Sequence, residues 1–210
     1  MKKIMMLVVL AAITLTTMAQ KDVIKLPQPN MTGGKPFYEV MNARQTQRQF
    51  SDKELTDQML SDLLWCANGI NRPDGKRTAP SARNCKEIDI YVFNKKGVYF
   101  YDPVANTLNL VFGTDARHKV SKQCEFAAKA PVILVFFANY GKMPGFDKEA
   151  REFYGATDCG YVSQNVYLYC AEKNLATVVM GAIDRESLSS IIPSRDGKVI
   201  LAQPVGFPEK

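Results

Sequence analysis

The sequence contains very little histidine, and this narrows the chemistry that it can support. His118 is the single histidine among 210 residues, so a serine or cysteine triad would have one possible base. A zinc site built around one histidine would need cysteine ligands, yet no two of the five cysteines are spaced as Cys-x-x-Cys. We therefore expect neither triad chemistry nor a metal site, and we expect His118 to lie in a surface helix.

Two glycine-rich motifs and any block of like charge are also absent. Neither GxGxxG nor GxxxxGK[ST] occurs, so neither a dinucleotide-binding domain nor a P-loop is indicated. The net charge of +6 is spread along the chain, without a run of roughly five or six like charges. Such a distribution favours neither a nucleic-acid partner nor an anionic membrane surface, whereas one anionic cofactor needs far less positive charge.

The first residues have the pattern of a secretory signal peptide. Lys2 and Lys3 precede an uncharged stretch over residues 4–19, and Thr17 and Ala19 are small residues at the positions that a signal peptidase reads. The stretch is shorter than the roughly 20 apolar residues of a spanning helix. We therefore predict a signal peptide over 1–19 and export, with a periplasmic location and no stable membrane anchor after cleavage.

After cleavage, residues 20–210 are expected to form one domain. Loss of Lys2 and Lys3 leaves 25 of the 27 basic residues against 21 acidic ones, a net charge of +4. A mature length of about 190 residues is sufficient for one core, and no repeat or linker divides the chain. Five cysteines are an odd number for an exported chain, so at least one would stay free or pair between chains.

Helical and strand patterns alternate along the chain. Apolar residues at helical spacing over 55–67 predict a helix capped by Thr56. Two apolar runs at 88–93 and 98–101 predict a β-hairpin in which Gly97 supplies an unusual backbone angle. Further helices are expected at 116–129, 158–174 and 185–192, and further strands at 132–138, 178–179 and 199–201. The pattern predicts an α+β domain with a small mixed central sheet flanked by helices.

One polar segment has a spacing that suits phosphate binding. Residues 44–50 read Arg-Gln-Thr-Gln-Arg-Gln-Phe. In an extended chain alternate side chains point the same way, so Arg44, Thr46 and Arg48 can converge as two cations and a hydroxyl. Guanidinium groups give paired, charge-assisted hydrogen bonds to phosphate oxygens. A solvated polar stretch is the alternative interpretation, because arginine is usually exposed.

Two other short segments could lie against a flat ring. At 80–84 the sequence Pro-Ser-Ala-Arg-Asn lets backbone approach closely while offering hydroxyl and amide hydrogen bonds. Met180 and Gly181 follow a short strand at 178–179, and their N–H groups could face an electron-rich ring edge. Taken alone, the glycine would simply end a strand.

The order and spacing of these three segments resemble the nitroreductase family of flavin mononucleotide (FMN) enzymes. The resemblance runs from about residue 37 to residue 207. It is closest to the branch that also contains dehydrogenases acting on azolines in modified peptides. It implies a nitroreductase-like, FMN-binding domain over 20–210, and a homodimer with FMN at the subunit interface.

The resemblance also implies roles for particular residues, in three groups. The FMN phosphate and ribityl chain would be held by Arg44, Gln45, Thr46 and Arg48, where Gln45 replaces a commoner basic residue. The loop that packs beside the flavin ring of the other subunit would contribute Pro80, Ser81 and Asn84. The amides at the ring edge would be those of Met180 and Gly181.

The end of the sequence departs from the family pattern. Many relatives continue past the turn at 206–208 into a basic stretch that gives a second phosphate contact, whereas this sequence reads Glu209-Lys210 there. We therefore expect FMN binding to depend mainly on Arg44 and Arg48.

The implied function is that of an FMN-dependent oxidoreductase of the nitroreductase type. Electrons would pass through flavin N5 to a nitroaromatic, a quinone or a similar small-molecule acceptor, with NAD(P)H as a candidate donor. Because the cofactor carries this chemistry, no catalytic side chain is assigned. Two alternatives stay open. One is an FMN-dependent dehydrogenase or oxidase of an organic or peptide substrate, which export would favour, and the other is a non-catalytic flavin-binding dimer.

Overall fold

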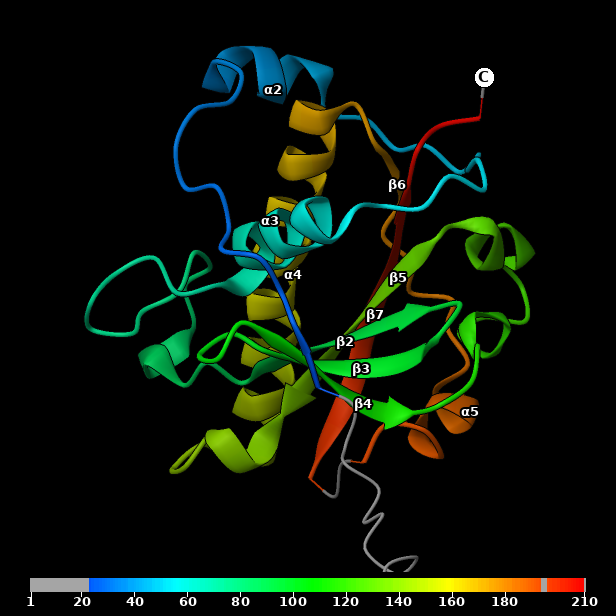
Figure 1. Ribbon diagram of the computed structural model, residues 1–210. Coiled ribbons are helices and arrows are strands. Elements are labelled where there is room, and N and C mark those ends of the chain that lie inside the picture. The colour runs from blue at the N-terminus through cyan, green and yellow to red at the C-terminus, as the bar shows by residue number, and fades with distance from the viewer. Residues whose placement is uncertain (1–22, 194–195, 210) are drawn as a thin grey trace, which may run out of the picture.

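The computed structural model describes residues 23–193 and 196–209 (Figure 1). The predicted signal peptide at 1–19 lies outside the described residues. Within the described residues, seven strands form one sheet in the order β1-β4-β3-β2-β5-β7-β6. Their bounds are β1 Val23–Lys25, β2 Ile88–Asn94, β3 Gly97–Asp102, β4 Thr107–Phe112, β5 Val132–Asn139, β6 Ala176–Thr177 and β7 Gly197–Gly206.

Neighbouring strands of the described sheet are antiparallel throughout. The α+β class is confirmed, but the expectation of a mixed sheet is wrong. The reason lies in the connections between strands. β2, β3 and β4 follow one another through short turns, and such turns join antiparallel strands, whereas parallel strands need long crossovers.

Four α-helices pack around this sheet in the described part of the chain: α2 Phe37–Ala43, α3 Asp57–Asn68, α4 Lys148–Lys173 and α5 Arg185–Ser189. Figure 1 shows α3 and α4 on one side of the sheet, α5 on the other, and α2 beside the C-terminal end of α4. A helix on each side gives the domain two hydrophobic cores, one on each face of the sheet.

Strand β5 shows why the central strands are apolar along their whole length. Leu134 and Phe136 belong to the core under α3 and α4, whereas Ile133 and Val135 belong to the core that includes Leu188 of α5. Alternate side chains of a strand point to opposite faces of a sheet. Because both faces of the sheet are covered here, the residues that point to either face are apolar.

Two local features that the sequence predicted are confirmed. Thr56 caps α3, where its hydroxyl accepts a hydrogen bond from the Met59 amide at 3.2 Å. Gly97 starts β3 with φ = +153°, and a Cβ atom at this position would lie 2.3 Å from the carbonyl oxygen of Phe112. The turn between β2 and β3 therefore requires glycine both for its backbone angle and for space.

The predicted helix at 116–129 is not formed. Two short 3-10 turns, Arg117–Lys119 and Glu125–Lys129, occupy this stretch. Ser121 lies between them, and its Oγ accepts hydrogen bonds from the amides two and three residues further on while donating to the carbonyl of Ala182. Such side-chain bonds to the backbone compete with helical hydrogen bonds and explain the break.

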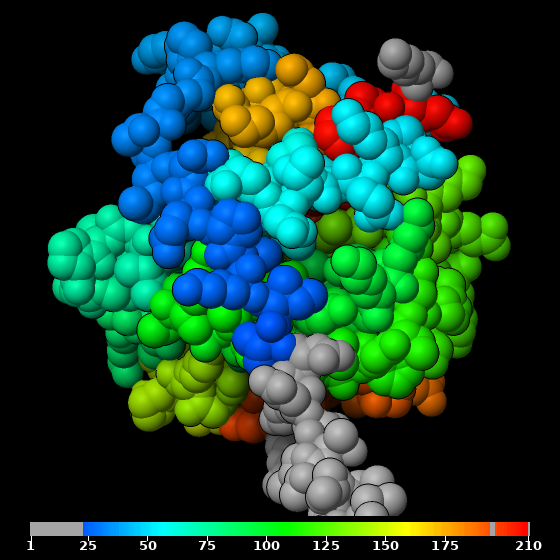
Figure 2. All heavy atoms as spheres, viewed as in Figure 1, coloured from blue at the N-terminus to red at the C-terminus, as the bar shows by residue number. Residues whose placement is uncertain are grey.

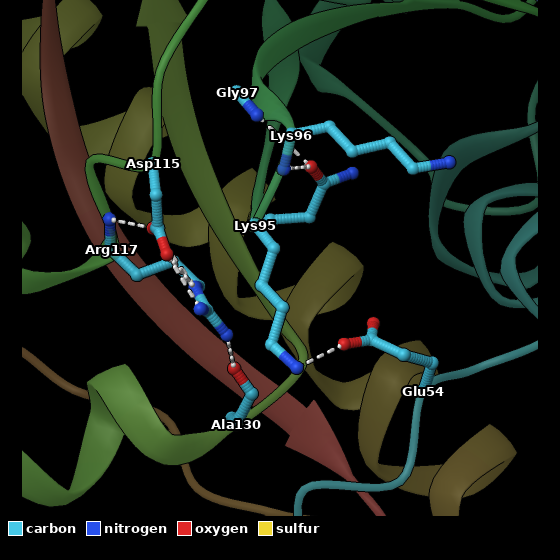
Figure 3. A network of polar contacts seen from close by, with 8 residues as sticks. Glu54, Lys95, Lys96, Gly97, Asp115, Arg117 and Ala130 are labelled. Atoms are coloured by element: carbon cyan, nitrogen blue, oxygen red, sulfur yellow. Dashed lines mark hydrogen bonds and ion pairs between the residues drawn. The ribbon is translucent and has the colours of Figure 1, made fainter.

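Arg117 anchors the same stretch from inside the fold (Figure 3). Its side chain is 9% exposed, forms a 2.6 Å ion pair with Asp115 and donates to the carbonyl of Ala130 at 2.8 Å. The guanidinium group of Arg117 lowers the pKa of Asp115 from its usual value. In Figure 3 the exposed pair Lys95–Glu54, at 2.8 Å, lies beside the pair of Arg117 and Asp115. A buried arginine bonded to both Asp115 and Ala130 fixes the turns in place.

The remaining elements differ from the prediction mainly in their bounds. Helix α4 begins at Lys148 rather than at 158, and its cap, Asp147, accepts a hydrogen bond from the Ala150 amide at 2.8 Å. It ends at Lys173 and is capped by Asn174, whose φ of +54° is left-handed. The predicted strand at 178–179 is not formed, because β6 ends just before it at Thr177, and α5 is shorter than predicted. β1, α2 and β4 were not predicted.

The two ends of the described chain both lie across other elements. The N-terminal segment, blue in Figure 2, runs over the front of the molecule from the sheet edge toward α2. The C-terminal residues emerge beside the cyan residues near 50, where Phe50 forms a β-bridge with Pro208. Within 23–193 and 196–209, no helix has the length and apolar character needed to cross a membrane.

Candidate functional site

The first candidate segment, residues 44–48, follows α2 and is held by backbone contacts. The amide of Gln47 donates to the carbonyl of Thr177 in β6 at 2.9 Å. Two residues past the segment, Phe50 bridges to Pro208. These contacts leave four side chains half-buried or exposed, namely those of Arg44, Gln45, Thr46 and Arg48. The segment is therefore fixed by its backbone and accessible through its side chains.

The third candidate segment lies next to the first, because it continues from β6. The amide of Met180 donates to the carbonyl of Ala202 at 2.7 Å, and the Ala202 amide returns a hydrogen bond at 3.1 Å. The Met180 amide is thus already bonded and is not available to a ring edge. Gly181 is exposed, and its N–H has no hydrogen-bond partner within the described chain. Of the two amides predicted to face the ring edge, the Gly181 amide is therefore available for a hydrogen bond and the Met180 amide is not.

Tyr167 of α4 joins the first and third segments. Its hydroxyl lies 3.0 Å from Thr46 Oγ1 and accepts a hydrogen bond from the Val179 amide at 3.0 Å. The guanidinium carbon of Arg44 lies 5.3 Å from the centre of the Tyr167 ring, within the range of a cation–π contact. The structure therefore brings together two segments that are far apart in the sequence.

Sequence reasoning missed Tyr167, because a tyrosine at helical spacing usually fills a core or an interface. The available signal was its hydroxyl. The hydroxyl of a tyrosine with 7% exposure normally has a hydrogen-bond partner, so a polar group had to be expected next to it.

The donors on the first segment fit an anion. Neither Arg44 nor Arg48 forms an ion pair with any described residue. Together with the Thr46 hydroxyl and the Gly181 amide, they form a set that consists almost wholly of hydrogen-bond donors. Such a set suits the oxygens of a phosphate-bearing ligand and offers little to a metal cation.

The second candidate segment is a tight loop tied to α4. The amide of Ala82 donates to Oδ2 of Asp158 at 2.8 Å, and the amide of Lys86 donates to Oγ of Ser81 at 2.9 Å. Positive φ angles of 49°, 56° and 54° occur at Arg83, Asn84 and Lys86. Pro80 and Asn84 are exposed. Three non-glycine residues in the left-handed region are held there by these contacts, so the shape of the loop is imposed by its surroundings.

Arg83 makes a contact that the sequence did not indicate. Its guanidinium carbon lies 4.4 Å from the centre of the Phe146 ring, in the loop before α4. The side chain is therefore partly occupied with an aromatic neighbour on its own chain.

The second segment does not meet the other two within one chain. It is tied to α4 at Asp158, whereas the first and third segments are tied to the same helix at Tyr167. Nine residues of helix separate these attachment points, a distance of about 13 Å along the axis. Each chain thus carries two separate parts of the predicted site, at different levels of α4 (Figure 1).

A pair of buried carboxyl groups lies under the second segment. Glu87 is fully buried, and neither of its carboxyl oxygens has a hydrogen-bond donor among the described residues. Its neighbour is the carboxyl group of Asp158, and two carboxyl groups can share a hydrogen bond only when one carries a proton. Burial and then the contact with Asp158 raise the pKa of Glu87 to about 7, whereas Lys142 lowers it.

The hollows of the described chain do not enclose the candidate residues. One of about 860 Å³ lies beside Phe50 and Phe207, and one of about 440 Å³ lies between residues 30–37 and helices α3 and α4. Gly181 borders a smaller hollow of about 310 Å³. None of these three hollows is lined by residues of more than one of the candidate segments.

Other titratable groups give no sign of a second reactive centre. The described residues contain no group of three histidine, cysteine or acidic side chains that could hold a metal ion. All five cysteines are free thiols, and burial raises the pKa of Cys66 to about 12 and raises that of Cys85. His118 is exposed in a 3-10 turn rather than in the predicted helix.

Comparison with known proteins identifies the relatives of this chain. The sequence pattern of the Nitroreductase family matches residues 41–207. The chain belongs to the nitroreductase family. A nitroreductase-like protein of Methanocaldococcus jannaschii is 29% identical over 195 residues, which cover 88% of this chain and 97% of the relative. Membership of this family supports an oxidoreductase.

Solved structures of other nitroreductase-like proteins confirm the fold. One from Ralstonia eutropha JMP134 is 36% identical, with a TM-score of 0.84 and 93% of each chain covered. Another, from Desulfovibrio desulfuricans, was solved in complex with FMN. It is 16% identical with a TM-score of 0.60, and the match covers 85% of this chain and 89% of that one. The nitroreductase-like fold predicted from the sequence is therefore confirmed.

Proposed function

We propose that this protein is an FMN-dependent oxidoreductase of the nitroreductase type. The observation that carries the proposal is the junction at Tyr167, which holds Arg44 and Thr46 next to Val179, two residues past the end of β6. Cationic and hydroxyl donors thus lie at the junction, and the free amide of Gly181 follows it by two residues in the chain. A ligand with a phosphate at one end and an electron-rich ring at the other matches this order. The Desulfovibrio relative of the same fold was solved with FMN.

The residues of the chain bind and orient the cofactor, and FMN, when bound, supplies the transfer of a hydride and electrons. Arg44 and Arg48 would neutralise the phosphate, and the Thr46 hydroxyl would donate a hydrogen bond to it. The N–H of Gly181 would point a fixed dipole at the ring edge. A donor placed there favours negative charge on the ring and so favours its reduced state.

The active form would be a homodimer with FMN at the subunit interface. Large apolar side chains are exposed on the two helices nearest the candidate segments, α2 and α4: Phe37, Tyr38, Met41, Phe153 and Tyr161. Exposed apolar surface of this kind favours association. The loop at 80–84 would then complete the site of the other subunit, because within its own chain it is attached to α4 about 13 Å from Tyr167.

The electron donor and acceptor can be separated by observing bound flavin. Rapid bleaching by NADH or NADPH, followed by reoxidation with a nitroaromatic or a quinone, supports the reductase. Bleaching by an organic or peptide substrate alone supports a dehydrogenase, and bleaching by neither supports a flavin-binding dimer without turnover. The visible spectrum of the protein after incubation with FMN and gel filtration is the first measurement, because a colourless protein would contradict the proposal.

The phosphate site is tested by Arg48→Ala. Loss of a charge-assisted hydrogen bond should weaken FMN binding by about tenfold or more, measured by quenching of flavin fluorescence. Lys198→Ala removes the same charge from an exposed position on β7, away from the candidate segments, and should leave the affinity unchanged. Equal affinity of Arg48→Ala and the unaltered protein would show that the phosphate lies elsewhere.

The enzyme would also be exported through cleavage near Ala19, and would act in the periplasm on a small molecule. Mass spectrometry of the protein from a periplasmic fraction should find an N-terminus near Gln20. An uncleaved chain in the cytosol would contradict export and would favour NAD(P)H as the electron donor.

A further inference from the structure

We infer that Tyr167 is a positioning residue that makes the Thr46 hydroxyl a hydrogen-bond donor to the phosphate of the cofactor. This inference rests on the proposed FMN site and deepens it. Tyr167 acts through its neighbours, because its hydroxyl is already surrounded by Thr46 and Val179.

The direction of the hydrogen bonds follows from counting donors and acceptors. The Val179 amide can only donate, so the Tyr167 oxygen accepts at that contact. The phenol hydrogen then needs an acceptor, and Thr46 Oγ1 at 3.0 Å is the acceptor in contact within the described chain. The reverse arrangement would leave the hydrogen of a side chain with 7% exposure unpaired, which costs free energy. Tyr167 therefore donates to Thr46.

This direction leaves the Thr46 hydrogen free to point outward. Thr46 is exposed, and Arg44 and Arg48 lie two residues away on either side. A hydroxyl that accepts a hydrogen bond donates a stronger one, because each bond in a chain polarises the next. An anionic oxygen between the two arginines is the acceptor that such a donor suits best.

The ring of Tyr167 has a separate role from its hydroxyl. It lies under the Arg44 guanidinium at 5.3 Å, and it is fixed on α4, whose buried residues include Val166 and Cys170 on either side. Tyr167→Phe removes the hydroxyl and keeps the ring. The variant therefore tests the hydrogen-bond chain without removing the contact with Arg44.

The experiment compares FMN with riboflavin, which has the same ring but no phosphate. Tyr167→Phe should weaken FMN binding by about fivefold to thirtyfold. Riboflavin binding should change by less, so that the preference for FMN over riboflavin falls. The matched control is Tyr169→Phe, which removes a buried hydroxyl from the same helix. That hydroxyl donates to the carbonyl of Met59 at 2.9 Å, so the control should leave the preference unchanged.

A double variant separates positioning from a general loss of structure. Once the Thr46 hydroxyl is absent, loss of the Tyr167 hydroxyl should have little further effect, so Tyr167→Phe in a Thr46→Val background should leave FMN affinity nearly unchanged. Additive losses in the double variant would overturn the inference. So would an unchanged preference for FMN over riboflavin in Tyr167→Phe, that is, equal losses for both ligands. If the unaltered protein binds FMN and only these results fail, Tyr167 is excluded and the FMN site stands. If the unaltered protein binds no flavin, both proposals fall.

Discussion

Glu87 and Asp158 place two carboxyl groups inside the protein, next to the loop that would flank the flavin. The groups that face Glu87 are Asp158 and Cys159 of α4, the thiol of Cys85 and the cation of Lys142. One cation does not offset burial and a second carboxyl group, so the proton is retained well above the usual range of a glutamate. The loop at 80–84 is attached to this pair through the amide of Ala82.

The stability of the protein should depend on pH because of Glu87. The folded protein holds this proton up to about pH 7, whereas the unfolded chain releases it near the ordinary value of 4.5. The contribution is therefore complete below pH 4.5, and the free energy of unfolding falls as pH rises from there to about 7. In Glu87→Gln the amide can donate to Asp158 at every pH, so this slope should disappear in urea unfolding series.

The control for this prediction is Glu54→Gln, which changes a glutamate whose side chain is 51% exposed and paired with Lys95. It should leave the slope as in the unaltered protein. An unchanged slope in Glu87→Gln would assign the pH dependence to other groups.

At the residue scale, the sequence predicted the accessible donors of the site better than the buried residue that holds them in place. Arg44 and Thr46 could be chosen because cations and hydroxyls at alternate positions have a direct chemical meaning. Their placement next to Val179 could not be predicted, because it depends on Tyr167, which comes from a helix far along the chain. The amide of Met180 was assigned to the ring edge, but the bridge to Ala202 consumes it, and such a bridge depends on sheet pairing.

Secondary-structure elements were predictable where local and global preferences agree. The capped helix α3 and the hairpin of β2 and β3 have short-range signals, namely a cap, a periodic apolar face and a turn glycine. The stretch 116–129 has helical composition, but Ser121 and the buried Arg117 form contacts with distant backbone that a helix would not allow. Contacts of this kind carry no local signature.

The hairpin gives a prediction at the scale of one element. Gly97→Ala should lower the free energy of unfolding by about 1–3 kcal/mol, because the added Cβ would lie 2.3 Å from a backbone oxygen of β4 and the positive φ disfavours alanine. Chemical denaturation measures this difference. Gly113→Ala is the matched control, since a Cβ atom there has no neighbour within 4 Å, and it should be nearly neutral. Equal effects at the two glycines would mean that the turn adapts.

For the whole molecule, the proposed dimer predicts that an exposed aromatic residue is required for assembly. Tyr38 on α2 is 85% exposed, and Tyr38→Glu would place a charge in the proposed interface. The variant should sediment as a monomer and should retain little flavin after gel filtration, with an unchanged far-ultraviolet spectrum. Val104→Glu changes a residue that is 78% exposed on the turn between β3 and β4 and should leave assembly intact. A Tyr38→Glu dimer that keeps its flavin would place the interface elsewhere.

The separation of the site along α4 has a genetic consequence. In the proposed dimer, each catalytic centre takes its phosphate contacts from one subunit and its ring-flanking loop from the other. A subunit altered at Arg48 and a subunit altered in the loop at 80–84 are then each defective as homodimers. When the two are expressed together, every mixed dimer contains one centre with both defects and one centre with none. Two inactive alleles would therefore complement each other and restore half of the centres in each mixed pair.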